Sequence, residues 1–282
     1  MVEVYLLAAL SPVASAPVEI ARSFQQGEKV SYVVTRKQKD ADSVMKGSGG
    51  TWRVDLEVLS VRPDETKLKL TRTTLDLDAE GSPALSDDLL QQMKRPSHVQ
   101  VLIRKDGKLE VTGDTAAPGG FEGSMQWYRD VLLSALPPKA VEPGDTWEEP
   151  YPADLSPALR PVGSPKIVYK FEGMAQLADK PSLKLGAVAA FEQVSDAVLG
   201  GEGPKIDLRI RRELRYTMWL RPADGRLLKN TGTETLTLES TSAQLPLRHS
   251  FTMTLEVLPW PSEPKQHMRI LLTPVAAVVY WD

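Results

Sequence analysis

The sequence predicts a mainly β protein: an antiparallel, strongly curved sheet or barrel made from two similar halves, with one or two covering helices. Three observations support this prediction. Apolar and polar residues alternate over many short segments, which is typical of strands with one buried face. Asp106-Gly107 and Asp224-Gly225 separate such segments, as the turns of β-hairpins do. Residues 121–136 instead repeat their apolar side chains at helical spacing, which indicates a helix that covers a face of the sheet.

Length and composition limit the kinds of protein that this chain can be. A chain of 282 residues is long enough for one large β domain or two smaller ones. The formal net charge of −3 gives no concentrated positive field of the kind that a nucleic-acid partner requires. Cysteine does not occur, which excludes disulfides, thiolate metal sites and a cysteine nucleophile. No apolar run reaches the roughly 18–20 residues of a transmembrane helix, so we expect no transmembrane segment.

Residues 1–16 resemble a secretory signal peptide. An apolar run over residues 4–10 is followed by small residues that end in Ala14-Ser15-Ala16. The usual basic start is missing, and Glu3 stands in its place. A truncated signal explains this pattern better than a buried strand does. We therefore expect cleavage near Pro17 and an exported protein.

A single β-rich domain is expected over residues 17–258, followed by a Pro-rich spacer and an apolar tail over residues 259–282. Its halves are residues 27–136 and 147–258. The first half is expected to contain strands over residues 27–34, 52–58, 67–78, 99–104 and 109–111. The second half is expected to contain strands over residues 166–171, 183–191, 206–220, 226–239 and 251–257.

Two helices are expected, both in the first half. Ser86 can cap a short helix over residues 86–94. The longer helix carries one apolar stripe, made of Phe121, Met125, Tyr128, Leu132 and Leu136. We expect this stripe to pack on the concave side of the sheet. A movable lid over a cavity is the alternative.

The two halves share short stretches of sequence. Residues 29–34 align with residues 166–171, and residues 102–109 align with residues 219–227 after one insertion. An internal duplication would produce these matches. Chance would produce them too, because strands and turns resemble one another, so both explanations stay open.

The strand over residues 206–220 carries a charge on its apolar face. Ile210 and Leu214 share that face with Arg212. Burying an unpaired guanidinium is costly, so Arg212 needs a carboxylate, a bulge or a wet cavity. Two interpretations follow: a bulge or structural ion pair, or a polar anchor inside an apolar ligand pocket. In the second, the candidate ligand-binding residues are Arg212, Tyr216, Met218, Met125 and Tyr128.

No pattern predicts catalysis, a metal or a cofactor. His98, His249 and His267 lack the spacing of metal ligands, and no Gly-x-Ser-x-Gly motif occurs. We therefore expect a non-catalytic protein that binds a hydrophobic or lipid-like ligand in a cavity of the sheet. The alternative is a structural or cell-envelope interaction protein with a filled core and no ligand.

The joint between the halves carries a resemblance. Val141-x-Pro143-Gly144-Asp145-Thr146-Trp147 resembles a segment of exported bacterial β-rich proteins that are recorded only as domains of unknown function. More remotely, the layout is similar to the open half-barrels of periplasmic lipoprotein and lipid carriers. The resemblance implies a periplasmic or secreted protein of the bacterial cell envelope, and it implies no catalytic residue.

Overall fold

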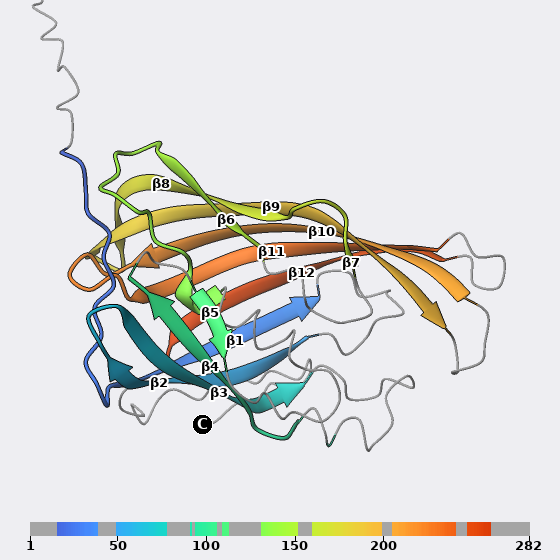
Figure 1. Cartoon of the computed structure of the whole chain (residues 1–282), viewed down its shortest axis with the longest axis horizontal. Helices are drawn as coiled ribbons and strands as arrows, with labels where there is room; N and C mark the ends of the chain where they lie inside the picture. The colour runs from blue at the N-terminus through green and yellow to red at the C-terminus, as the bar shows by residue number, and fades with distance from the viewer. Residues whose placement is uncertain are drawn as a thin grey trace, which may run out of the picture.

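A computed structural model describes residues 16–38, 49–77, 91, 94–105, 109–112, 131–151, 160–198, 205–240 and 247–260, with the backbone alone at 111–112, 195–198, 205–207 and 247. In these residues twelve strands form one antiparallel sheet (Figure 1). The strands are β1 (Lys29–Gln38), β2 (Gly50–Val61), β3 (Glu65–Leu77), β4 (Ser97–Arg104), β5 (Leu109–Thr112), β6 (Thr146–Pro150), β7 (Arg160–Pro161), β8 (Lys166–Leu177), β9 (Lys180–Val198), β10 (Lys205–Leu220), β11 (Leu227–Ser240) and β12 (Leu247–Pro259).

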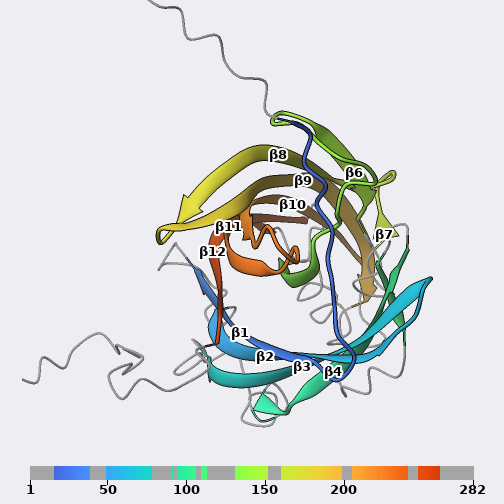
Figure 2. The ribbon, with the colours of Figure 1, turned by 90° about the vertical axis from the view of Figure 1, so that its left-hand side faces the viewer.

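The strand order is β5-β4-β3-β2-β1-β12-β11-β10-β9-β8-β6, with β7 also paired to β9. Each half contributes a five-stranded meander, β1 to β5 and β8 to β12. The meanders join through β1 and β12, where Val34 lies opposite Val257. The sheet curls strongly, as Figure 2 shows, but it remains an open sheet. This confirms the predicted mainly β, strongly curved antiparallel architecture, in its open form and not as a closed barrel.

The inner face of the curled sheet holds the main apolar cluster. Alternate residues of each strand are buried there, as the period of two requires, and Val34, Val54 and Leu70 are almost fully buried. Residues 131–133 are helical and lie inside the curl, with Leu132 buried in this cluster as expected. Residues 134–136 are not helical, so the helix ends at Leu133 and the predicted end at Leu136 is wrong. Residues 121–130 of the predicted helix lie outside the described residues, as do residues 1–15, most of residues 86–94 and residues 261–282.

An N-terminal strap, residues 16–27, crosses one end of the curl (Figure 2). At its start, Val18 and Val141 exchange two backbone hydrogen bonds of 2.8 and 2.9 Å. At its other end, the Gly27 amide donates to the Val58 carbonyl over 2.9 Å. Between these points Ile20 is buried in the main cluster. The strap therefore links the β6 side of the sheet to β2, and we call this the strap end of the molecule.

The strap runs tightly over Gly225, in the turn between β10 and β11. Gly225 has a φ of +63°, and a Cβ there would lie 2.3 Å from the Ala21 carbonyl oxygen. We expect Gly225→Ala to lower the free energy of unfolding by about 1–3 kcal/mol, measured by urea denaturation. Gly163→Ala is the matched control, because Gly163 has a φ of +77° and open space around it. Equal losses in both variants would show that contact with the strap has no influence.

Candidate functional site

Arg212 points to the inner face of β10, between Ile210 and Leu214. Its partners across the neighbouring strands are Phe191 on β9 and Leu236 on β11. The register runs without a break on both sides of Arg212. The interpretation that a bulge turns this side chain outward is therefore wrong. The Arg212 side chain is 19% exposed. The inward position predicted from the sequence is therefore observed.

Glu234 on β11 is the carboxylate that meets Arg212. Glu234 Oε1 lies 3.6 Å from Arg212 Nη1, and Glu234 Oε2 lies 2.7 Å from Arg36 Nη2 on β1. The Glu234 side chain is only 4% exposed. We call Arg36, Glu234 and Arg212 the charged row; its two guanidiniums and one carboxylate carry a net charge of +1.

The two arginines of the charged row are not equivalent. Arg36 donates a short, charge-assisted hydrogen bond to Glu234. The 3.6 Å separation at Arg212 is an ion pair but exceeds hydrogen-bond distance. Arg212 Nε is buried, and no acceptor in the described part of the chain hydrogen-bonds to it. Arg212 therefore retains unused donor capacity in a largely desolvated position.

The sequence contained a signal for Glu234 that alternation within single strands did not reveal. Glu234 lies on the same face of β11 as Leu236 and Leu238, and Arg36 lies on the same face of β1 as Val34. β11 forms a hairpin with β10. A carboxylate on the inward face of β11 is therefore the expected partner for a buried arginine on β10. Comparing inward charges between neighbouring strands would have identified this pair.

The charged row separates two apolar clusters. On one side lies the main cluster, which contains Leu214, Tyr216 and Met218. On the other side lies the second cluster, consisting of buried Ile210, Leu236, Phe251 and Met253 with Leu208 and Leu238 packed against them.

The structure places the predicted ligand-binding residues in different surroundings. Tyr216 and Met218 are 6% and 1% exposed and lie in the main cluster. Tyr216 is four residues from Arg212, or about 13 Å along an extended strand, so the two share a face without being neighbours. Met125 and Tyr128 lie outside the described residues.

The strap end of the interior is filled. Arg22 donates to the carbonyls of Leu133 (3.0 Å) and Ser134 (3.3 Å), and Asn230 Nδ2 donates to the Val131 carbonyl over 2.9 Å. The void that Arg22, Leu132 and Leu133 help to line measures about 10 Å³, roughly the space of one water molecule. No room for a larger ligand remains in this void.

Burial shifts two pKa values at the strap end. Desolvation lowers the pKa of Arg22 to about 10, although Tyr32, Tyr169 and Glu149 oppose this shift. Desolvation also raises the pKa of Tyr32 to about 12, against the influence of Arg22. At neutral pH Arg22 is therefore still a cation and Tyr32 a neutral phenol, so neither group is poised for proton transfer.

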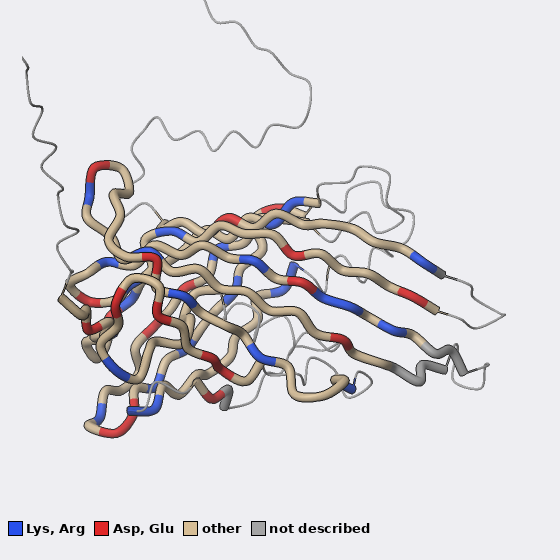
Figure 3. Tube along the Cα trace, turned by 90° about the horizontal axis from the view of Figure 1, so that it is seen from above, with Lys and Arg blue, Asp and Glu red and all other residues tan. Residues whose placement is uncertain are grey.

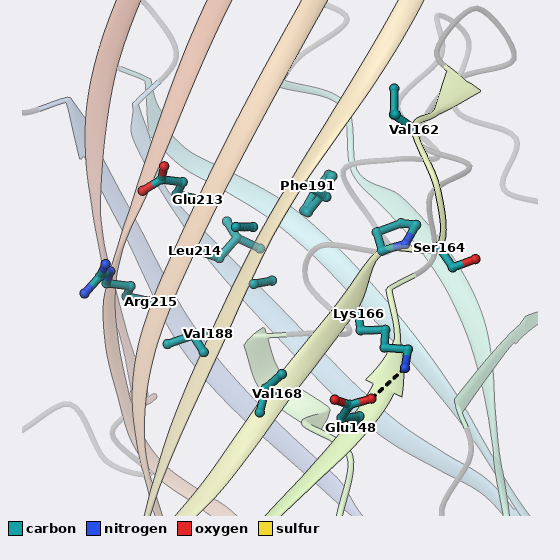
Figure 4. Close-up of a pocket in the computed structure, with 13 residues that line it drawn as sticks. Glu148, Val162, Ser164, Lys166, Val168, Val188, Phe191, Glu213, Leu214 and Arg215 are labelled. Atoms are coloured by element: carbon teal, nitrogen blue, oxygen red, sulfur yellow. Dashed lines mark hydrogen bonds and ion pairs between the residues drawn. The ribbon is translucent and has the colours of Figure 1, made fainter.

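Two open grooves lie on the outer face of β8, β9 and β10. Their volumes are about 530 and 620 Å³, and they share Val168, Val188 and Arg215. Figure 4 shows the first groove, with the 2.7 Å pair of Lys166 and Glu148 at its rim. Basic and acidic residues are interleaved along the strands on this side (Figure 3). Among the described residues that line the two grooves there is no histidine.

In the ranges that the structure describes, no three His, Asp or Glu residues gather as a metal site. No described helix is long and apolar enough to cross a membrane. No protein-family model matches the chain, and no curated protein matches it. Among solved structures the chain is similar to one from "Lipid-protein interactions in lipovitellin", with 10% identity and a TM-score of 0.43. That match covers 84% of this chain, which spans 25% of the lipovitellin chain.

Proposed function

We propose that this protein is a non-catalytic binding protein that holds a hydrophobic, lipid-like ligand on the inner face of its curved sheet. The observation that carries the proposal is the position of the second cluster. The last residue of β1, Gln38, pairs with Met253, whereas β12 begins at Leu247, where it pairs with Ser240 of β11. Among the described strands, β9 to β12 extend past the ends of β1 to β4 (Figure 1). We call this the long-strand end.

The long-strand end offers what an apolar ligand needs. Leu208 and Leu238 are only partly buried at the margin of the second cluster. Covering apolar surface is favourable by about 25 cal/mol per Å², so a hydrocarbon chain laid along these residues would stabilise the complex. The filled strap end leaves this end as the place of entry.

The second candidate is a structural or cell-envelope interaction protein without a ligand. The filled strap end favours this alternative, because its void of about 10 Å³ shows side chains packed to near completion. The two candidates differ in one measurable property, the uptake of an apolar molecule.

Binding of dodecan-1-ol, an uncharged amphiphile, tests the proposal. We expect the purified protein to bind it, and organic extracts of natively purified protein to contain a lipid-like compound by mass spectrometry. Leu238→Asn should weaken binding about 10-fold or more, because it removes apolar surface and buries an amide. Thr237→Asn, on the outer face of the same strand, is the control.

Leu208→Asn with Arg209→Asn gives a second matched pair on β10. Melting temperatures identify any variant that has not folded. Wild-type protein that does not take up dodecan-1-ol, or inner and outer variants that bind it alike, would contradict the proposed function.

Export is part of the proposal, and it rests on Ala14-Ser15-Ala16 and on the resemblance at the joint. We expect the mature chain to begin within one or two residues of Pro17, because proline directly after the cut disfavours cleavage. A cut at this position would keep Val18 and its bridge to Val141. N-terminal sequencing of protein from the envelope fraction tests this, and a mature chain that retains Met1 would overturn it.

A further inference from the structure

We infer that the ligand is a monoanionic amphiphile whose carboxylate binds Arg212 while its hydrocarbon chain lies along the second cluster. This inference rests on the proposed function and specifies the chemical class of its ligand. It assigns Arg212 a role as the head-group contact of the inner face.

Arg36 and Arg212 share Glu234 unequally. Its carboxylate is already engaged by Arg36 at 2.7 Å, and its other oxygen is 3.6 Å from Arg212. The buried Nε of Arg212 has no acceptor in the described part of the chain. A guanidinium presents parallel N–H donors that match the two oxygens of a carboxylate. Arg212 is thus a largely buried donor whose capacity a second carboxylate would fill.

The charge of the row also favours a ligand with one negative charge. The two guanidiniums and one carboxylate of the row have a formal net charge of +1, in a partly desolvated position. Among the described inward-facing residues of β9 to β12, Glu234 is the one carboxylate. Besides Arg212, the other titratable side chains on this face are Tyr216, in the main cluster, and His249, 5.9 Å from Phe251 between ring centroids. One added negative charge neutralises the row, whereas a dianion would exceed it. A single carboxylate head group therefore fits best.

Arg212 lies at the edge of the second cluster. Ile210 and Leu236 adjoin it and belong to the second cluster. A carboxylate at Arg212 would direct the attached chain toward Leu208 and Leu238, the partly buried residues at the margin of the second cluster, and so toward the long-strand end. In the other direction lie Leu214 and Tyr216, in the packed main cluster. The charged row therefore fixes the orientation of an amphiphile, with its chain toward the long-strand end.

The test compares dodecanoate with dodecan-1-ol, which have equal chain lengths, at pH 8 where the carboxylate is ionised. Wild-type protein should bind dodecanoate at least about 10-fold more tightly. Arg212→Gln should reduce dodecanoate binding about 10- to 100-fold and leave dodecan-1-ol binding unchanged. Arg211→Gln is the matched control, because Arg211 lies on the outer face and is 65% exposed; it should change neither affinity.

The outcomes separate this inference from the proposed function. If wild-type protein binds neither compound, both the proposed function and this inference are wrong. If it binds the alcohol as tightly as the carboxylate, or if Arg212→Gln weakens both equally, only the inference fails. Arg212→Lys retains the charge without the paired donors and should lose an intermediate amount of dodecanoate affinity. If Arg212→Gln does not fold, the wild-type comparison and Arg212→Lys decide.

Discussion

Replacing Glu234 by leucine lowers the free energy of unfolding by about 3–5 kcal/mol. The reason is that Glu234 is the shared anion of Arg36 and Arg212, and its side chain is 4% exposed. Without it, two guanidiniums remain in a partly desolvated interior with no carboxylate between them. Arg212→Leu should behave differently, because Glu234 keeps its 2.7 Å bond to Arg36. We expect that variant to stay within about 1 kcal/mol of wild type, or to gain stability.

Urea denaturation of both variants at neutral pH measures the difference. Glu239→Leu is the matched control on the same strand, since Glu239 faces outward and pairs with the exposed Arg248 over 3.4 Å. Its effect should be below about 1 kcal/mol. If Arg212→Leu destabilises as much as Glu234→Leu, the row is a single structural unit in which both arginines are needed. Such a result would leave Arg212 no spare capacity for a ligand.

Leu132→Ala lowers the free energy of unfolding by about 2–5 kcal/mol. Leu132 is 3% exposed and lies among Leu133, Tyr32 and Leu56 around the small void at the strap end. Removing its isobutyl group enlarges that void at a point where the side chains of Arg22 and Asn230 donate hydrogen bonds to backbone carbonyls and hold the surroundings in place. Collapse around the new space is therefore restricted.

Leu258→Ala is the control for Leu132→Ala, because Leu258 is 39% exposed. Its loss should remain below about 1 kcal/mol. Thermal melts and urea titrations of both variants test the expectation. An unchanged unfolding transition for Leu132→Ala would show that the end of this helix does not support the core.

Much of the inner face could be predicted, because a strand's pleat fixes its two faces locally. The alternation at Trp52, Val54 and Leu56 predicted three side chains that are indeed buried. The same period gave the inward direction of Arg212. Glu234 could also have been predicted as the partner of Arg212, because β10 and β11 form one hairpin whose register follows from its turn.

Arg36 could not be predicted in the same way. Its bond to Glu234 joins residues 198 positions apart, and it depends on the pairing of β1 with β12. That pairing depends on how both meanders curl, which no local pattern encodes. The position of the strap could not be predicted from the sequence for a related reason. Ile20 and Phe24 are anchored by tertiary packing, without the alternation that identifies a strand.

The internal duplication suggested by the sequence is only partly reflected in the arrangement of strands. Both halves form five-stranded meanders, and β1 and β8 open them. The matched Asp-Gly turns, however, lie between the fourth and fifth strands of the first meander and between the third and fourth of the second. The matched turns therefore do not occupy equivalent places in the two meanders.

The strap also bears on the order in which the chain can fold. Its bond from Arg22 to the Leu133 carbonyl spans 111 residues, and the strap also contacts the β10–β11 turn, which is synthesised much later. Folds dominated by such distant contacts have high contact order and fold slowly, since the entropy of closing long loops is lost before the contacts form. Because both anchoring regions must exist before the strap can dock, its docking is expected to be a late step. If the proposed leader precedes residue 16, it would be joined to the part of the chain that docks last, so the rest of the polypeptide would still be unfolded during the proposed export.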